Sequence, residues 1–290
     1  MRCSVIVPSL NQARFIGECL ASLIEQSGVD LEVIVFDGGS DDDTVSILKS
    51  FGNRISWTSE TDGGQANAIN KGVRASTGEI VGYLNSDDRL LPDTLQKVIK
   101  LFEAPEAPDI VHGNAEYINE CSDFIGRYRT LPWTPANLGA QCSVCQPATF
   151  WRRSLINQIG EMNERLVCSM DYDFWIRATL AGAKVSESSE VLASSRDYAS
   201  TKTRALRGTI YREIIGMQKR HFGRAHAQWF YEFLCYLKWE ERVEYRAALP
   251  SRLNSLLSVA RLLSRFSGFQ KPECSSFFDH PPAKFEDRTT

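Results

Sequence analysis

The sequence predicts an α/β fold built around a mainly parallel sheet. Short apolar runs alternate with segments of helical spacing through the first hundred residues, an order typical of parallel strands joined by right-handed crossovers. The runs are almost continuously apolar, as in sheets that helices cover on both faces. With 290 residues, the chain is long enough for one large domain, or for one domain with an appendage.

The first 102 residues supply most of this predicted sheet. Apolar runs that end at a proline or at small polar residues predict strands at Ser4–Val7, Leu31–Phe36, Ile55–Thr58 and Ile80–Leu84. Apolar side chains at helical spacing predict helices over 12–26, Asp41–Ser50, Gln65–Val73 and Pro92–Phe102. The proline that opens the last of these helices suits a first helical turn.

After residue 108 the alternation gives way to shorter runs. These predict strands, some of them antiparallel, at Ile110–Val111, Ala115–Asn119, Arg127–Thr130 and Val185–Ser194. Helices are expected over Ser154–Ile159 and Tyr172–Ala181. From Arg204 to Arg265 the pattern is helical with an interruption near Pro250, and the last fifteen residues are expected to be loosely ordered.

Charge divides the chain into two parts. Residues 1–200 carry 17 Lys and Arg against 27 Asp and Glu, whereas residues 201–290 carry 16 against 9. We therefore predict an acidic α/β body over residues 1–203 and a basic, amphipathic helical extension over residues 204–290. The acidic body, which has no nucleic-acid-binding motif, argues against a nucleic-acid partner. The extension either contacts an anionic membrane surface or packs on the body or on another subunit of an oligomer.

The sequence also bears on location. The N-terminal segment turns polar after one short apolar run and lacks the long apolar region of a secretory signal. The sequence contains no run of 18 apolar residues, the length at which a membrane-spanning helix is expected. Its eight cysteines are scattered along the chain, which is typical of reduced thiols. We expect a cytoplasmic protein, either free or peripheral at the inner membrane face.

Polar residues follow three of the four N-terminal strands. They are Pro8–Asn11, Asp37–Ser40 and Asn85–Asp88. For one loop, turn and helix-cap chemistry explains such residues, but three loops at one edge of a sheet favour a binding site. Adjacent carboxylates at Asp87 and Asp88 suit Mg²⁺ or Mn²⁺, which are held by one or two carboxylates together with substrate phosphates.

Five blocks of the sequence resemble glycosyltransferase family 2. They are SVIVPSLNQARFIGECLASLIEQ, EVIVFDGGSDDDT, SETDGGQANAINKGVRASTGEIVGYLNSDD, QPATFWRRSLINQIG and MDYDFWIRA, which together span about residues 3–203. The resemblance implies a GT-A fold, Mn²⁺ or Mg²⁺ as cofactor, and inversion at the transferred sugar. It also implies a UDP- or GDP-linked donor and a carbohydrate or lipid-linked acceptor, in cell-surface polysaccharide or glycolipid assembly.

The resemblance also implies roles for single residues. Those that would bind the nucleotide sugar are Pro8, Leu10, Asn11, Asp37, Gly38, Asp62, Gln65, Asn67, Lys71, Asn85 and Ser86. Asp87 would bind the metal. Asp171 would be the general base that an acceptor hydroxyl of high pKa needs, although it also suits a helix cap. The residues expected near the sugar or acceptor are Asp88, Gln146 and Trp175, of which Trp175 also suits the core.

The sequence departs from the family pattern at three positions. Leu10 stands where the family often has an aromatic residue, and Asn85 replaces the first acid of the D-x-D motif. After Arg196, Tyr198 stands where a histidine is common. Two other functions agree less well with the sequence. A nucleotidyltransferase usually has a glycine-rich phosphate loop, which PSLNQARF is not, and a non-catalytic binding protein would not need both Asp87 and Asp171.

Overall fold

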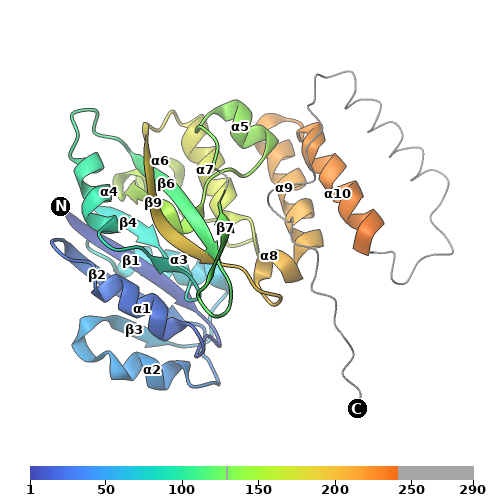
Figure 1. Cartoon of the computed structure of the whole chain (residues 1–290). Coiled ribbons are helices and arrows are strands. Elements are labelled where there is room, and N and C mark those ends of the chain that lie inside the picture. Colours follow the sequence, from blue (N-terminus) through green and yellow to red (C-terminus); the bar gives the residue numbers. More distant parts are fainter. Residues whose placement is uncertain (129, 241–290) are drawn as a thin grey trace, which may run out of the picture.

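The computed structural model describes residues 1–128 and 130–240. They form one mixed sheet with helices on both faces, so the predicted α/β architecture is confirmed (Figure 1). Within the described residues, the order of strands across the sheet is β3 (Ser56–Ser59), β2 (Asp30–Asp37), β1 (Arg2–Ser9), β4 (Ile80–Tyr83), β8 (Thr149–Arg152), β6 (Ile110–Ile118), β9 (Val185–Arg196) and β5 (Arg89–Leu90). The remaining strand, β7 (Phe124–Arg127), pairs with β6.

The N-terminal half of the sheet is parallel. Its strands are β1 (Arg2–Ser9), β2 (Asp30–Asp37), β3 (Ser56–Ser59) and β4 (Ile80–Tyr83). The helices between them are α1 (Ile16–Ile24), α2 (Thr44–Ser50) and α3 (Gln65–Ala75), with a short 3₁₀ turn, η1 (Gly52–Arg54). All four strands lie where the apolar runs predict them. Their carboxyl ends therefore meet at one edge of the sheet.

The second half of the sheet mixes directions. Its strands are β5 (Arg89–Leu90), β6 (Ile110–Ile118), β7 (Phe124–Arg127), β8 (Thr149–Arg152) and β9 (Val185–Arg196). β6 and β9 pair in parallel, while β8 lies antiparallel between β4 and β6. The helical elements are α4 (Thr94–Phe102), α5 (Pro135–Ala140), η2 (Gln146–Ala148), α6 (Ser154–Ile159) and α7 (Met170–Leu180).

The sequence-based prediction differs from this half in four strands, and α5 and η2 were not predicted. β6 is one strand where two were expected, because its polar centre still pairs with β9, with register shifts beside Asn114. The strand expected at Arg127–Thr130 lies earlier, as β7. β5 and β8 were not predicted, since two and four residues are too short to show a hydrophobic period.

The core is divided between the two faces of the sheet. Successive strand residues point to opposite faces, so Val5 and Val7 join one buried cluster with α1, α2 and α4, while Ile6 joins the other. The second cluster contains α3, α6 and α7 and the fully buried Trp151 and Trp175. Both faces are therefore covered, as the continuous apolar strands predict.

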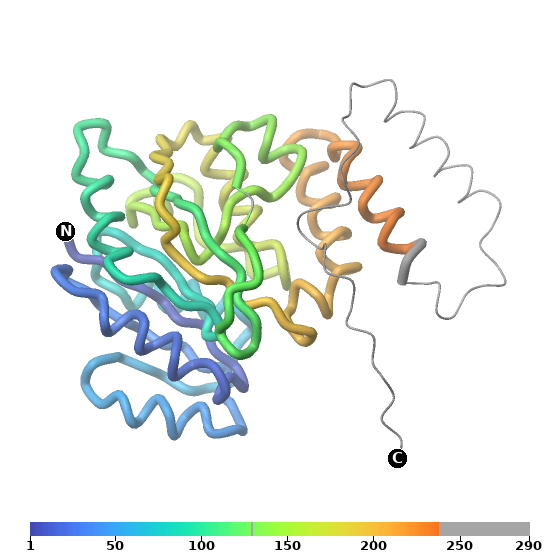
Figure 2. The backbone as a smooth tube through the Cα atoms, in the orientation of Figure 1, coloured from blue at the N-terminus to red at the C-terminus, as the bar shows by residue number. Residues whose placement is uncertain are grey.

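The C-terminal helices pack on this second face. They are α8 (Lys202–Ala205), α9 (Arg207–Phe222) and α10 (Ala227–Glu240), and Figure 2 shows the chain running from β9 into them. Tyr211, Ile214 and Met217 of α9 are buried in the same cluster as α3 and α7. Helix α9 ends at Gly223, whose φ of 74° is left-handed. The break expected near Pro250 and the loosely ordered last residues lie outside the described part.

A membrane-spanning helix was not expected from the sequence. Among residues 1–128 and 130–240, the structure has no helix that is both long and apolar enough to cross a bilayer.

Candidate active site

A cleft of about 530 Å³ opens at the carboxyl ends of β1 and β4. It is lined by the segments after these strands, by the start of α7 and by the chain from the end of β9 to α9. Ten of the predicted site residues line it: Pro8, Leu10, Asp62, Gln65, Asn85, Ser86, Asp87, Asp88, Gln146 and Asp171. The structure thus brings together residues that are up to 163 positions apart in the chain.

The loops after β1 and β2 brace each other beside this cleft. Asn11 has a left-handed φ of 53°, which asparagine tolerates better than most residues. Its backbone N–H donates to Ser40 Oγ at 2.7 Å, and its side-chain Oδ1 accepts from the N–H of Asp41 at 3.0 Å. Asn11 does not line the cleft, so its observed part is to tie the two loops together.

Asp37 lies under the loop that follows β2. Only 1% of it is exposed, and its carboxylate accepts hydrogen bonds from the hydroxyls of Ser40 and Ser59 at 2.5 and 2.6 Å. The backbone N–H groups of Gly39 and Ser40 also donate to it. The neighbouring Gly38 lies beside the Asp62 carboxylate, where a Cβ would come within 3.4 Å. Asp37 therefore shapes the loop and does not line the cleft.

Hydrogen bonds link three amide side chains of the cleft lining into a chain. Gln65 Nε2 donates to Asn85 Oδ1 at 2.6 Å, and Asn85 Nδ2 donates to Gln146 Oε1 at 3.2 Å. Gln146 in turn donates to the Tyr83 carbonyl at 2.6 Å. At the other end, Lys202 Nζ donates to Gln65 Oε1 at 2.8 Å. This network joins α3, β4, η2 and α8, and it fixes polar groups along the cleft.

Asp87 and Asp88 follow β4 and differ in their surroundings. Asp87 lines the cleft and accepts a 2.9 Å hydrogen bond from the Tyr198 hydroxyl through Oδ2. Burial raises the pKa of Asp87, and this hydrogen bond opposes the rise. Asp88 is 4% exposed and accepts from the N–H of Arg196 at 2.8 Å. Burial, with Asp87 beside it, raises the pKa of Asp88 to about 8.

Arg196 holds the turn that carries these two carboxylates. Its guanidinium donates to the Asp87 carbonyl at 2.8 Å and to Glu18 at 2.6 Å. It also lies over the ring of Phe15, 4.6 Å from the centroid. Because its donors are engaged in these contacts, Arg196 acts as a brace between β4, β9 and α1.

Asp171 lies in the first turn of helix α7 and lines the same cleft. It lines the cleft with its neighbours Cys168 and Met170 and accepts a 2.7 Å hydrogen bond from the N–H of Tyr172. Burial raises the pKa of Asp171 to about 6. A carboxylate with this pKa is mostly ionised at neutral pH and still basic enough to accept a proton.

The cleft offers few ligands of its own for the expected Mn²⁺ or Mg²⁺. Among the described residues, no three His, Cys, Asp or Glu side chains gather as a self-sufficient metal site. Such cations are commonly held by one or two carboxylates, with phosphate oxygens and water completing the shell. Asp87 offers a carboxylate in the cleft, and its Oδ1 makes no hydrogen bond to a side chain in the described part. The residues therefore fit a cation shared with a diphosphate.

Besides Asn11, Asp37 and Gly38, three further predicted residues do not line the cleft. Asn67 donates to Glu164 at 3.0 Å, and Lys71 forms an ion pair with Glu60 at 2.7 Å. Trp175 is fully buried, with ring contacts to Trp151 and other aromatic residues. The structure thus places Trp175 in the core, which is the alternative that its apolar neighbours in the sequence left open.

Several cleft residues escaped the sequence analysis. Lys202 lines the cleft and carries a positive charge into a lining rich in carboxylates. The hydroxyls of Ser9 and Thr201 also belong to cleft residues, and both are buried without a hydrogen-bond partner in the described part of the chain. Ser9 lies in the Pro8–Asn11 segment that the sequence singles out. No motif or spacing marks Thr201 and Lys202, because only the fold brings their segment to the cleft.

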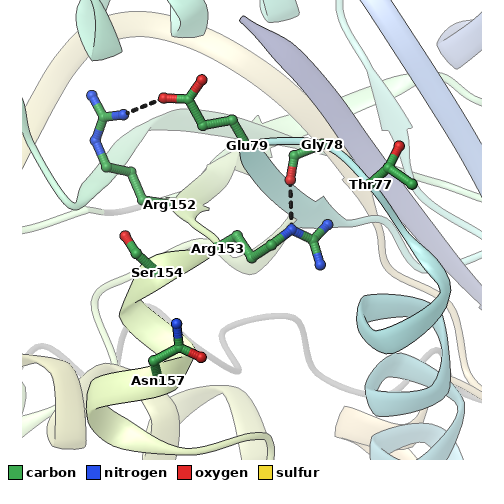
Figure 3. A pocket seen from close by; sticks show the side chains of 7 residues that line it. All are labelled: Thr77, Gly78, Glu79, Arg152, Arg153, Ser154 and Asn157. Atoms are coloured by element: carbon green, nitrogen blue, oxygen red, sulfur yellow. Dashed lines mark hydrogen bonds and ion pairs between the residues drawn. The ribbon is translucent and has the colours of Figure 1, made fainter.

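A second hollow of about 460 Å³ lies at the other end of β4 (Figure 3). It is lined by Thr77, Gly78, Glu79, Arg152, Arg153, Ser154 and Asn157. Arg153 donates to the carbonyls of Gly78 and Val73, while Arg152 pairs with Glu79 at 3.0 Å and donates to Phe102. Both guanidinium groups are thus hydrogen-bonded to other residues of the protein. We therefore interpret this hollow as part of the packing of the fold and not as a binding site.

Comparison with known sequences points to one family. A family model described as glycosyl transferase family 2 matches residues 4–164. A PGL/p-HBAD biosynthesis glycosyltransferase of Mycobacterium bovis is 34% identical over 201 residues, which cover 66% of this chain and 75% of that protein. An uncharacterized glycosyltransferase of Nostoc sp. is 30% identical over 132 residues, 42% of this chain and 41% of that protein.

Comparison with solved structures confirms the fold. Staphylococcus aureus TarS 1–349 in complex with UDP-GlcNAc matches with a TM-score of 0.63 and 20% identity, over 90% of this chain and 88% of that one. The chain covers 53% of a longer TarS structure. The mannosyltransferase PcManGT of Pyrobaculum calidifontis, in complex with GDP-Man and Mn²⁺, matches with a TM-score of 0.60 and 16% identity, over 92% and 81%. These neighbours are GT-A glycosyltransferases, so the predicted GT-A fold is confirmed.

Proposed function

This chain belongs to glycosyl transferase family 2, and from that membership we propose an inverting, metal-assisted transfer of a sugar from a nucleotide diphosphate to an acceptor hydroxyl. One observation carries the proposal. Asp87, at the end of β4, and Asp171, at the start of α7, line the same cleft. A diphosphate needs cationic help at one end of the reacting bond, and an acceptor alcohol needs a base at the other.

The donor is proposed to be a UDP- or GDP-linked sugar. TarS was crystallised with UDP-GlcNAc and PcManGT with GDP-Man, and both share this fold. In this chain the nucleoside would lie along Pro8, Leu10 and Asp62, which line the end of the cleft beside the β2 loop. The unpartnered hydroxyl of Ser9 supports this placement, since a buried hydroxyl in a binding cleft is normally satisfied by its ligand.

The phosphates are proposed to lie between Asp87 and Lys202. Four carboxylates line the cleft, at Asp62, Asp87, Asp88 and Asp171, so an anionic ligand needs cations there. Asp87 would hold Mn²⁺ or Mg²⁺, which when bound neutralises charge on a departing diphosphate. Lys202 supplies a second positive charge from α8, fixed by its hydrogen bond to Gln65.

Asp171 is proposed as the general base. Its carboxylate would accept the acceptor's proton as the hydroxyl oxygen attacks the anomeric carbon. That carbon loses its bond to the diphosphate oxygen on the opposite face, so its configuration inverts. Asp88 and Gln146 would border the sugar from the floor of the cleft, where Asn85 bonds to both.

The chemistry of the acceptor and the role of the extension follow more generally. Family membership supports a carbohydrate or lipid-linked acceptor in cell-surface polysaccharide or glycolipid assembly. We also propose that residues 1–203 form the catalytic body and that residues 204–290 form a basic extension. The excess of Lys and Arg in the extension supports peripheral contact with an anionic membrane surface.

Donor turnover tests the proposed reaction. The protein is incubated with Mn²⁺ and a panel that includes UDP-GlcNAc and GDP-Man, with EDTA as the control, and the released phosphate species are identified. Sugar transfer to water or an acceptor releases a nucleoside diphosphate. Release of a sugar 1-phosphate, the leaving group when the α-phosphorus of the donor is attacked, would instead indicate a nucleotidyltransferase. Tight binding without turnover across the panel would indicate a non-catalytic binding protein.

A further inference from the structure

The Glu213 carboxylate of helix α9 accepts hydrogen bonds from three consecutive backbone amides. Its Oε1 accepts from the N–H of Val167 at 2.6 Å, and its Oε2 accepts from Cys168 and Ser169 at 3.0 and 2.9 Å. These three residues lead directly into α7, which begins at Met170. One side chain from the C-terminal extension therefore fixes the backbone that introduces Asp171.

These amides need an acceptor from elsewhere. The N–H groups at the start of a helix have no partner within the helix, and a negative charge near them is favourable. The Ser169 side chain, at the N-cap of α7, makes no capping hydrogen bond. Glu213 supplies acceptors to the three amides that directly precede α7, from a helix 44 to 46 residues further along the chain.

Side chains of α8 and α9 make two further contacts with the same region. Lys202 of α8 donates to the Val167 carbonyl at 3.1 Å. One turn into α7, His221 of α9 contacts Asp173, with Nε2 and Oδ1 2.8 Å apart. Three contacts from α8 and α9 thus fix the approach to α7 and its first turn. Since Cys168, Met170 and Asp171 all line the cleft, the position of this segment sets one wall of the site.

We propose that Glu213 is a positioning residue for sugar transfer, and that α9 is thereby a working part of the active site. The inference rests on the proposed role of Asp171 as base. Glu213 does not line the cleft and contacts no reacting atom. It orders residues 167–169 so that the Asp171 carboxylate stands at a fixed place in the cleft, where small displacements are costly to the rate.

The charge of Glu213 also acts on Asp171. Burial raises the pKa of Asp171, hydrogen bonding to the N–H of Tyr172 opposes the rise, and the nearby charge of Glu213 adds to it. Other titratable groups that interact with the Asp171 charge include the thiols of Cys142, Cys145 and Cys168 and the phenols of Tyr83 and Tyr128. Burial raises the pKa of each of them, which keeps them neutral at physiological pH. Removing the Glu213 charge should therefore lower the pKa of Asp171.

The test compares Glu213→Gln with Glu161→Gln. The first replaces one accepting oxygen with an NH₂ group that cannot accept from the amides. The second is a matched control, because it removes a charge from an exposed ion pair with Arg74 and leaves residues 167–169 untouched. For Glu213→Gln we expect a kcat lower by roughly ten- to a hundredfold, a donor KM close to wild type, and faster hydrogen exchange at residues 167–169. In the pH profile of Glu213→Gln, the acidic limb, where the rate falls as the pH is lowered, should also move to lower pH.

Glu213→Asp is the second variant. It keeps both accepting oxygens and the charge, so its acidic limb should stay at the wild-type position even where kcat falls. A Glu213→Gln protein with wild-type kcat, or with unchanged exchange at residues 167–169, would overturn the inference. So would a shift of the acidic limb that is equal in the Asp and Gln variants. A wild-type protein that releases no nucleoside diphosphate would overturn the proposed reaction instead, and the exchange data would still report on the Glu213 contact.

Discussion

Tyr198 donates its hydroxyl to Asp87 Oδ2 at 2.9 Å, which ties the segment after β9 to the end of β4. The ring of Tyr198 packs against Phe15, with 5.1 Å between centroids, so the hydroxyl is held in place from behind. Tyr198 stands where the family resemblance suggests a histidine. In this chain, the residue at that position donates a hydrogen bond to Asp87, which would hold the metal.

Tyr198→Phe should therefore weaken catalysis without unfolding the protein. The change removes one hydrogen bond to a carboxylate, a contact worth about 1.5–3 kcal/mol, and keeps the ring against Phe15. We expect kcat/KM for the donor to fall about tenfold or more, and the Mn²⁺ concentration needed for half-maximal rate to rise. Tyr117→Phe, outside the cleft lining, is the control. Wild-type kinetics in Tyr198→Phe would mean that this hydrogen bond has no functional part.

Lys202→Met should mainly affect donor binding. The substitution keeps most of the side-chain volume and removes the only lysine of the cleft lining in the described residues. Loss of a charge-assisted hydrogen bond to phosphate should raise the donor KM by about ten- to a hundredfold, with a smaller change in kcat. Lys202→Arg should recover part of the affinity. An unchanged KM in initial-rate measurements would place the phosphates elsewhere in the cleft.

The rate should depend on pH through Asp171. Because burial raises the pKa of Asp171 to about 6, the carboxylate is protonated below that pH and cannot accept the acceptor's proton. We expect kcat to fall about tenfold per pH unit below about 6 and to level off above it. Initial rates between pH 5 and 8 check this. A rate that stays level down to pH 5 would argue against Asp171 as the base.

Two glycines test the packing of the fold. A Cβ at Gly72 of α3 would overlap Ile6 of β1, so Gly72→Ala should lower the free energy of unfolding by about 1–3 kcal/mol. Gly216, within α9, has open space around it, and Gly216→Ala should raise stability by up to about 1 kcal/mol through helix propensity. Urea unfolding of the two variants measures both. Equal midpoints in the two variants would contradict this packing of α3 on β1.

The sequence predicted the parts of the site that lie next to a strong local pattern. Asp87 follows the apolar run that predicts β4, whereas Asp171 is singled out by the resemblance of its block to the family. The long-range contacts left no such signal. Lys202 meets Gln65 across 137 residues, and Glu213 meets Val167 across 46. No spacing rule connects residues that only the packing of α8 and α9 brings together.

Side-chain environment was harder to foresee than position. Asp37 is among the residues expected to bind the nucleotide sugar, and the sequence did not show that its carboxylate accepts hydrogen bonds from Ser40 and from Ser59 of a different strand. Trp175 belongs to a block that resembles the family, but α7 presents it to Trp151 in the core. An amphipathic pattern does not distinguish an aromatic residue on a buried face from one on a cleft wall, because both faces are shielded from water.

The division of labour between Asp87 and Asp171 is tested most directly by measuring donor binding and sugar transfer in Asp87→Ala and Asp171→Asn. Binding is read from the rise in melting temperature with a UDP- or GDP-linked sugar, with and without Mn²⁺, since a ligand of the folded state stabilises it. Asp171→Asn should keep the Mn²⁺-dependent rise and lose about 10²–10⁴-fold in transfer rate. Asp87→Ala should lose the Mn²⁺-dependent rise. Wild-type transfer by Asp171→Asn, or an intact Mn²⁺-dependent rise in Asp87→Ala, would contradict the account.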